Sequence, residues 1–283
     1  MYNETQGTLT LYPEVVSFTA KGETGQPTFD FESPLEGVST WFDLPDGPII
    51  LEGGERKVIP IVITPPKDAE PGGHYATVFF GTSPPNIEDP GSLALATKLG
   101  SLFLLRVFGD VTEEGNIAEF GLVDGKTSFN RLPATLFTRF QNSGNIHLRP
   151  TGTIAIKNLI GAETAKLDFN AKKGATLPDS IRKYDTIWEK GQVKEVTGNF
   201  WSKFWTEFSN EKNNFALGKY KANITIMAGT LIQDTAEVSF WVWPWRILLI
   251  FLIVIALVIF LLIMLMKKYN KWIVNKARGT QQK

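Results

Sequence analysis

Cysteine is absent from this sequence of 283 residues, and histidine occurs only twice, as His74 and His147. Without cysteine the chain forms no disulfide, no Cys/His zinc site and no thiol nucleophile. The sequence also contains no Gly-x-Ser-x-Gly elbow and no glycine-rich phosphate loop. The adjacent Glu113 and Glu114 lie in a polar linker, where solvated charge is expected rather than calcium binding or acid–base catalysis. We therefore predict no catalytic residue, no cofactor and no metal ion, and a protein that is not an enzyme.

Charged and polar residues are missing from Ile247 to Met266, ILLIFLIVIALVIFLLIMLM. At a rise of about 1.5 Å per residue, this run forms a helix of roughly 30 Å, the thickness of a bilayer's hydrocarbon core. A buried helix of a soluble protein would show a polar face over this length. Aromatic residues flank the run, as is typical of the two headgroup layers. They are Trp241, Trp243 and Trp245 before it, and Tyr269 and Trp272 after it. The sequence predicts one transmembrane helix within residues 244–266.

Acidic residues are absent after the apolar run, and basic residues are frequent there. These basic residues are Lys267, Lys268, Lys271, Lys276, Arg278 and Lys283. By the positive-inside rule, the tail 267–283 is cytoplasmic and residues 1–243 lie outside the cytoplasm. The part before Arg246 has 22 Lys and Arg residues against 29 Asp and Glu, a net charge of minus 7, which argues against nucleic-acid binding. We predict a single-pass protein of the cytoplasmic membrane with an acidic exterior.

Helix signals are rare before the apolar run. Short segments rich in Val, Ile, Thr, Tyr and Phe alternate with Gly, Pro and Asn turns, as in β-sandwiches. The expected strands are Thr8–Ala20, Lys57–Thr64, Tyr75–Gly81, Ile117–Val123, Ala134–Gln141, Gly152–Leu159, Lys166–Phe169, Ile181–Trp188, Tyr220–Met227 and Thr235–Val242. Leu93–Gly109 is compatible with one bent strand, two strands or a helix. The predicted fold is all-β, with two tandem immunoglobulin-like β-sandwich domains, 1–110 and 111–243, before the transmembrane helix.

The two halves of the exported part repeat each other loosely. Asn3 precedes a strand as Asn142 does, and Tyr75 and Tyr220 each follow a glycine at the entry to an apolar strand. The spacing from asparagine to tyrosine is 72 positions in the first half and 78 in the second. Both tyrosines are predicted to form structural tyrosine corners, in which the hydroxyl bonds a nearby backbone group.

The repeat also predicts that the first domain is N-terminally incomplete. About thirty residues with two expected strands precede Asn142 in the second copy, whereas only Met1 and Tyr2 precede Asn3. The first ten residues, MYNETQGTLT, show no signal peptide. We expect Met1 to be an internal methionine of a longer exported protein.

An aromatic insertion, residues 199–215, interrupts the strand pattern of the second domain. Trp201, Phe204, Trp205 and Phe208 fall at i, i+3, i+4 and i+7, the spacing of one helix face. Three interpretations remain open for these candidate ligand or membrane-interface residues. The helix packs over the end of the sandwich, dips into the outer leaflet, or offers an aromatic platform to a sugar or protein ligand.

Several segments resemble the WxL-interacting surface proteins of Gram-positive-type bacteria. GERKVIPIVITPPKDAEPGGHYATVFFGTSPP and LGSLFLLRV resemble their first domain, and FQNSGNIHLRPTGTIAI, LPDSIRKYD and FALGKYKANITI resemble their second. The resemblance implies two immunoglobulin-like domains at a bacterial cell surface, with peptidoglycan and WxL-type surface proteins as partners. It carries no ligand-contacting residue to a position of this sequence.

The predicted function is therefore non-catalytic binding or scaffolding at the cell envelope. The alternatives are an extracytoplasmic assembly chaperone that accepts a donated strand and, with least support, a cell-wall enzyme.

Overall fold

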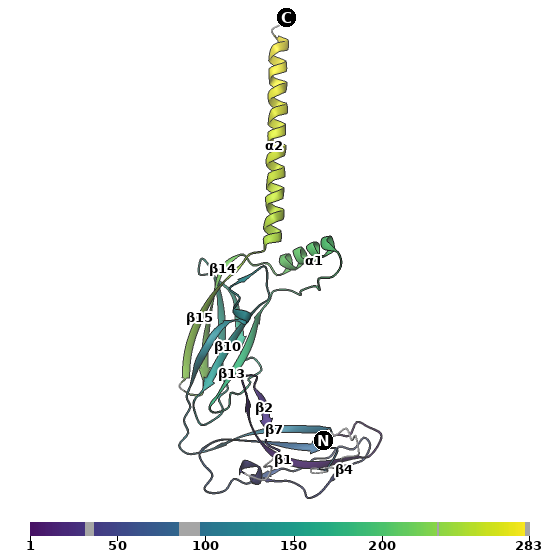
Figure 1. The fold of residues 1–283 in the computed structure, drawn as a ribbon, viewed down its shortest axis with the longest axis vertical. Coiled ribbons are helices and arrows are strands. Elements are labelled where there is room, and N and C mark those ends of the chain that lie inside the picture. The colour runs from purple at the N-terminus through teal and green to yellow at the C-terminus, as the bar shows by residue number, and fades with distance from the viewer. Residues whose placement is uncertain (32–36, 85–96, 231, 281–283) are drawn as a thin grey trace.

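The structure, a computed structural model, describes residues 1–31, 37–84, 97–230 and 232–280, with the side chains of the final helix described to Ile273. Two groups of strands follow one another along an elongated body, and helix α2 (Trp245–Thr280) projects from the end of the second group (Figure 1). The prediction of a mostly β chain with one C-terminal apolar helix is confirmed. The boundary at residue 110 stays a prediction.

The first strand group is built on an antiparallel sheet of order β2-β1-β6-β7. Its strands are β1 (Leu9–Lys21), β2 (Gln26–Phe29), β6 (Gly72–Gly81) and β7 (Lys98–Val107). The short β4 (Ile49–Leu51) pairs with the start of β1, and β3 (Phe42–Asp43) pairs with β5 (Val62–Ile63) after a 3-10 turn at Gly37–Trp41. The expected strand Lys57–Thr64 is wrong except at Val62–Ile63. Leu93–Gly109 gives one strand from Lys98, and residues 93–96 lie outside the described residues.

The second strand group contains two sheets, of order β13-β10-β8 and β12-β11-β14-β15-β9. The first comprises β8 (Gly115–Leu122), β10 (Ala134–Asn142) and β13 (Ser180–Trp188). The second comprises β9 (Ser128–Phe129), β11 (Thr151–Asn158), β12 (Glu163–Phe169), β14 (Gly218–Ala228) and β15 (Ile232–Val242). A 3-10 turn, Val123–Gly125, follows β8, and helix α1 (Phe200–Asn213) interrupts the strand order.

The predicted repeat is visible in the strand order. The antiparallel order β2-β1-β6-β7 in the first group has the same succession as β12-β11-β14-β15 in the second. Tyr75 lies on β6 and Tyr220 on the corresponding β14. The second sheets differ, because the counterpart of the β10–β13 pair is reduced, among the described residues, to bonds between Met1–Asn3 and Glu55–Lys57.

Two buried asparagines hold equivalent turns in the two halves. Asn3 donates from Nδ2 to the carbonyl of Gly7 at 2.8 Å, and Asn142 donates to that of Ile146 at 2.7 Å, each four residues on. Each Oδ1 accepts a backbone N–H two residues on, and each amide also reaches a distant carbonyl. This side-chain capping of a turn is a reason for asparagine at both positions, because no apolar residue would satisfy these buried groups.

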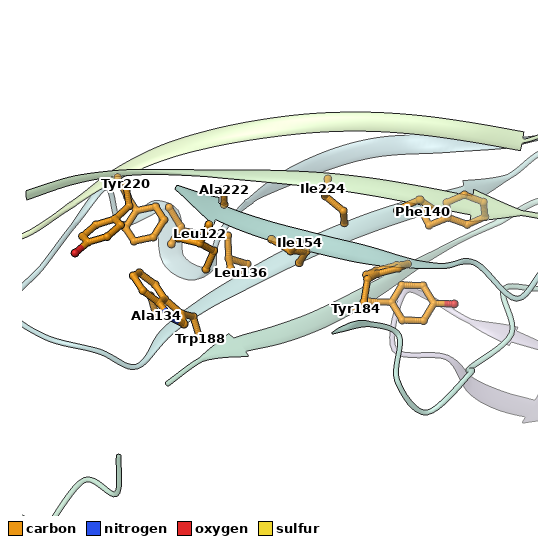
Figure 2. Packing of buried hydrophobic residues seen from close by; sticks show 14 of the residues in the cluster. Leu122, Ala134, Leu136, Phe140, Ile154, Tyr184, Trp188, Tyr220, Ala222 and Ile224 are labelled. Atoms are coloured by element: carbon orange, nitrogen blue, oxygen red, sulfur yellow. The ribbon is translucent and has the colours of Figure 1, made fainter. Parts of the chain in front are cut away.

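The cores of the two groups differ in size. In the second group, alternate residues of β10 point inward from Ala134 to Asn142, the period of a half-buried strand. They meet a large cluster that includes Phe140, Ile154, Trp188 and Ile224 (Figure 2). The buried residues of the first group's cluster are Leu11, Ile49, Leu51, Val78 and Phe80. The smaller cluster follows from the smaller second sheet, which leaves less apolar surface covered.

Candidate functional site

Strand β7 forms an edge of the first strand group. It pairs with β6 from Gly72↔Val107 to Gly81↔Lys98, and no strand of the described residues pairs with its other side. Its counterpart β15, in contrast, is joined at its end by β9. Alternate residues of the ten in β7 therefore point their backbone donors and acceptors away from β6, and this row is a ready template for another extended chain.

Strand β7 carries exposed apolar side chains that a bound chain could contact. Leu99 is 66% exposed and Leu102 50%, whereas Phe103 packs against the small cluster of the first group. Gly100 lies beside the ring of Phe79, where a Cβ atom would come within 2.7 Å of the ring. Leu99 and Leu102 thus add one exposed apolar side chain to each face of the sheet beside its edge strand.

The inner end of β7 lies at the junction between the two strand groups. A partly open cavity of about 200 Å³ lies there, with Leu102 and Leu104 on one side and Leu177, Ile181 and Arg182 on the other.

Polar contacts hold the junction together. In the turn after β1, the Glu23 carboxylate pairs with Arg139 of β10, and its carbonyl accepts the Lys183 N–H at 2.8 Å. Hydrogen bonding from the Arg139 guanidinium lowers the pKa of Glu23 below its usual range, and desolvation opposes this only in part. Gly73 donates its N–H to the carbonyl of Asn145 at 2.8 Å. These contacts join one end of the first sheet, where β1 ends and β6 begins, to the second group.

Glu113 also belongs to the junction, and the expectation that it is solvated is wrong. Its carboxylate accepts the Thr230 N–H at 2.9 Å and pairs with Arg106 of β7 at 3.2 Å. The Thr230 N–H is the main cause that lowers the pKa of Glu113, with smaller effects from Arg106. The sequence missed this role because the partners lie 117 and seven positions away.

The two predicted corner tyrosines have different surroundings. The Tyr220 hydroxyl accepts the Leu217 N–H at 3.2 Å, and its ring packs against Trp188 and Phe240. The Tyr75 hydroxyl lies 3.5 Å from Nδ1 of His147, across the junction, and the His147 backbone is also within its hydrogen-bonding reach. Burial raises the pKa of Tyr75 and lowers that of His147, because each charged form loses hydration.

Helix α1 carries the four aromatic candidates, of which two are half-buried and two are exposed. Asn199 caps the helix by accepting the Ser202 N–H at 2.9 Å. Phe204 and Phe208 are half-buried, and Phe204 contacts Trp245 with 6.5 Å between ring centroids. Trp201 is 66% exposed and Trp205 55%. The two tryptophans therefore do not pack over the sandwich end.

Polar residues at the end of α1 bond the segment 189–199, which leads from β13 into the helix. Asn210 accepts the Lys194 N–H and donates to the Lys194 carbonyl, both at 2.9 Å. Asn214, just after the helix, accepts the Gly191 N–H at 3.0 Å. Both asparagines are buried. The aromatic spacing predicted a helix, but it gave no sign that polar residues would dock it.

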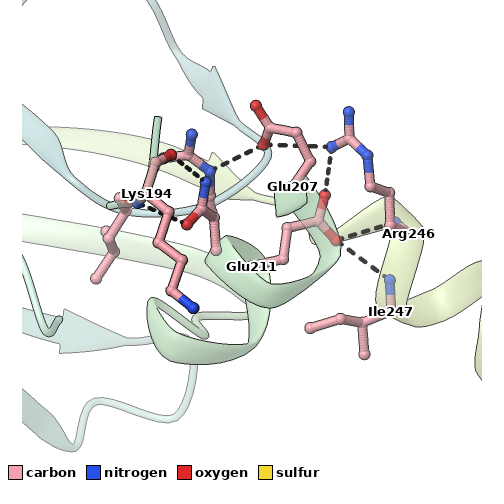
Figure 3. A network of polar contacts seen from close by, with 8 residues as sticks. Lys194, Glu207, Glu211, Arg246 and Ile247 are labelled. Atoms are coloured by element: carbon pink, nitrogen blue, oxygen red, sulfur yellow. Dashed lines mark hydrogen bonds and ion pairs between the residues drawn. The ribbon is translucent and has the colours of Figure 1, made fainter. Parts of the chain in front are cut away.

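Glu211 ties α1 to the start of α2 (Figure 3). Its carboxylate is fully buried and accepts the backbone N–H groups of Arg246 at 3.0 Å and Ile247 at 3.2 Å. It also pairs with the Arg246 guanidinium at 2.8 Å. A carboxylate at these free N–H groups satisfies two donors that the helix itself cannot, and it is stabilised by the helix dipole. Glu207 lies 3.8 Å from Arg246 and pairs with Arg131 at 3.2 Å.

The predicted membrane anchors lie at the two ends of the apolar part of α2. Residues Trp245–Ile273 are long and apolar enough to cross a membrane, and no residue of their most apolar 18-residue window is buried by the rest of the described chain. Trp241 and Trp243 stack with 5.6 Å between ring centroids, and Tyr269 and Trp272 stack at 6.2 Å. Lys267, Lys268 and Lys271 are exposed on α2, whereas the side chains of Lys276 and Arg278 lie outside the described part.

The described residues contain no group of three His, Cys, Asp or Glu side chains arranged to hold a metal ion. His74 lies on β6, where it contacts the Glu70 carbonyl at 2.8 Å and the Trp41 ring, so the structure gives it a packing role.

No protein-family model and no protein of known function matches the sequence. Among solved structures, the class 5 fimbriae chaperone CfaA is similar at 11% identity, over 84% of this chain and 89% of that one, with a TM-score of 0.38. The E. coli chaperone DraB has 13% identity over 83% and 86%, and the Pseudomonas aeruginosa CupB2 chaperone 8% over 85% and 90%, both with a TM-score of 0.33. Similarity at this level carries no argument about function.

Proposed function

We propose that this chain is a non-catalytic, membrane-anchored binding protein of the cell envelope, which binds an extended segment of a partner protein along β7. The observation that carries the proposal is the free side of β7, with Leu99 and Leu102 exposed beside it. An added strand would continue the β6–β7 ladder, so that main-chain hydrogen bonds provide affinity and apolar side chains provide specificity.

The orientation of the protein is part of the proposal. The α2 helix crosses the cytoplasmic membrane, with the strand groups outside and the C-terminus inside, and the apolar length of Trp245–Ile273 supports this. The lysines after the apolar run support the direction. The resemblance to WxL-interacting proteins adds peptidoglycan and WxL-type surface proteins as candidate ligands.

A second function, that of an assembly chaperone, is favoured by the small core of the first strand group. Its cluster is covered by short pairs such as β3–β5, where the second group has a three-stranded sheet. A donated apolar strand would extend this cover and shield the client's strand until assembly. Unlike a scaffold, a chaperone releases its strand to the client's next partner.

A lysine substitution on the edge tests both functions. In Leu99→Lys, a charge stands where the added strand's side chains would pack, while the β6–β7 pairing is kept. Met227→Lys is the matched control, because Met227 is a 58% exposed apolar strand residue of the second group. The full chain in nanodiscs is incubated separately with a surface-protein extract and with purified wall.

Loss of a retained surface protein in Leu99→Lys, but not in Met227→Lys, supports binding at β7. Equal retention by all three proteins refutes it. Retention of wall polymer by all three assigns the ligand to another surface. Release of the retained protein by a competing strand peptide, but not by a scrambled one, distinguishes a chaperone from a scaffold.

A further inference from the structure

Phe200, Trp201 and Trp205 give α1 an outward face that is aromatic and mostly exposed. Phe200 is 73% exposed, Trp201 66% and Trp205 55%. Trp201 and Trp205 precede the docked residues Asn210 and Asn214 by nine positions each, and nine positions are two and a half helical turns. The two tryptophans therefore point away from the segment 189–199, which bonds the opposite side of the helix.

The aromatic face of α1 lies at the same height along the molecule as the first turn of α2. The α1 helix runs crosswise beside the first turn of α2, between the second strand group and the apolar helix (Figure 1). Contacts of Glu211 with Arg246 and Ile247, and of Phe204 with Trp245, fix it there. If α2 spans a bilayer, its first turn lies at the headgroup layer, so the face of α1 lies there as well.

The charges and rings around the face suit a lipid surface. Exposed Lys212 follows Trp201 by eleven positions and Trp205 by seven, whole turns of the helix, so it stands on the same side. A lysine beside tryptophans is the composition of interfacial helices, since the ammonium reaches phosphates while the indoles occupy the headgroup boundary. The stacked and partly exposed Trp241 and Trp243 lie next to the start of α2.

We propose that α1 is an interfacial helix whose Phe200, Trp201 and Trp205 insert into the outer lipid leaflet beside α2. This inference rests on the proposed membrane anchoring by α2. Two points of attachment, the span and the interfacial helix, fix the tilt of the second strand group over the bilayer. The contact between Glu211 and the start of α2 makes the two attachments one rigid unit, which sets the direction in which the strand groups project.

Single-cysteine labelling tests the inference, because the chain has no cysteine of its own. Four full-length variants, Trp201→Cys, Trp205→Cys, Lys203→Cys and Ile255→Cys, are labelled with an environment-sensitive fluorophore. They are reconstituted in phosphatidylcholine–phosphatidylglycerol vesicles. Lys203 is the matched control, since it is exposed on α1 but turned well away from the tryptophans. Quenching is measured with lipids labelled near the headgroup or deep in the chain, and with iodide in water.

The expected result is quenching of labels at positions 201 and 205 by the shallow lipid quencher, with several-fold less iodide quenching than at position 203. Equal iodide quenching at all three α1 positions overturns the inference. So does shielding from iodide without lipid quenching, because a protein contact would then cover the face. The label at position 255 distinguishes failure of the α1 inference from failure of the proposed membrane anchoring. If the deep lipid quencher does not quench this label, the proposal that α2 anchors the protein in the membrane is wrong.

Discussion

Glu211 is a buried carboxylate that joins α1 to the start of the apolar helix α2. The change Glu211→Gln keeps an acceptor for the N–H groups of Arg246 and Ile247 but removes the charge. Hydrogen bonds to charged groups contribute about 1.5–3 kcal/mol and neutral ones about 0.5–1.5 kcal/mol, so the change should cost about 1–1.5 kcal/mol. Since about 1.4 kcal/mol is a factor of ten, the joint should open roughly tenfold more often.

Glu211→Ala removes every contact and leaves a partly buried guanidinium behind. Breaking a buried ion pair costs about 3–5 kcal/mol, and we expect the lower end, about 3 kcal/mol, because Arg246 keeps Glu207 within 3.8 Å. The guanidinium side chain is also 17% exposed, so water relieves part of the penalty. Local opening should then rise by roughly two orders of magnitude.

The assay is hydrogen exchange of the full chain in nanodiscs, read at the amides of Arg246 and Ile247. Glu207→Gln is the control, because Glu207 is 21% exposed and such pairs contribute about 0–1 kcal/mol. Exchange in the sandwich core, for example at Ile154, should stay unchanged in all variants. If exchange at these two amides is as slow in Glu211→Ala as in Glu207→Gln, the carboxylate does not hold the joint and the reasoning fails.

Three further changes probe the two strand groups. Asn142→Ala should lower the free energy of unfolding by about 3 kcal/mol, because three buried backbone groups lose their partner; urea unfolding of the second group measures it against Asn145→Ala. Tyr220→Phe should cost about 1 kcal/mol in the same assay, since only the bonds to Leu217 are lost. His147 has a pKa below its ordinary 6.5 in the folded state, so its contribution is complete above pH 6.5 and is lost as the pH falls through the folded pKa. Stability measured against pH should show this loss in the native chain and not in His147→Gln, whereas a loss of equal size in both would exclude His147.

Local sequence patterns predicted most strands, but they could not predict polar contacts between residues that are far apart in the sequence. Alternation in segments such as Ala134–Gln141 gave β10 within one residue, because one face of the strand is buried and the other is not. Lys57–Thr64 has equally high strand propensity, yet only Val62–Ile63 pairs, since a strand needs a partner that the first group does not supply there. Strand propensity shows that a segment suits a β-sheet, but it does not show whether a partner strand is available to pair with it.

The same distinction applies to the candidate sites. Helical spacing placed Trp201 and Trp205 on one face of a helix, but the spacing is identical for a packed and a free face. The opposite side of the helix decides between them: there Asn210 and Asn214 bond backbone groups of Lys194 and Gly191, in the segment between β13 and α1, and so turn the tryptophans outward. An aromatic face left free by a polar docking face, beside the first turn of an apolar helix, needs a nonaqueous neighbour to be stable. Because Glu211 fixes α1 to that turn, the neighbour must reach the level at which α2 begins, and a lipid headgroup layer meets this condition wherever α2 spans a bilayer.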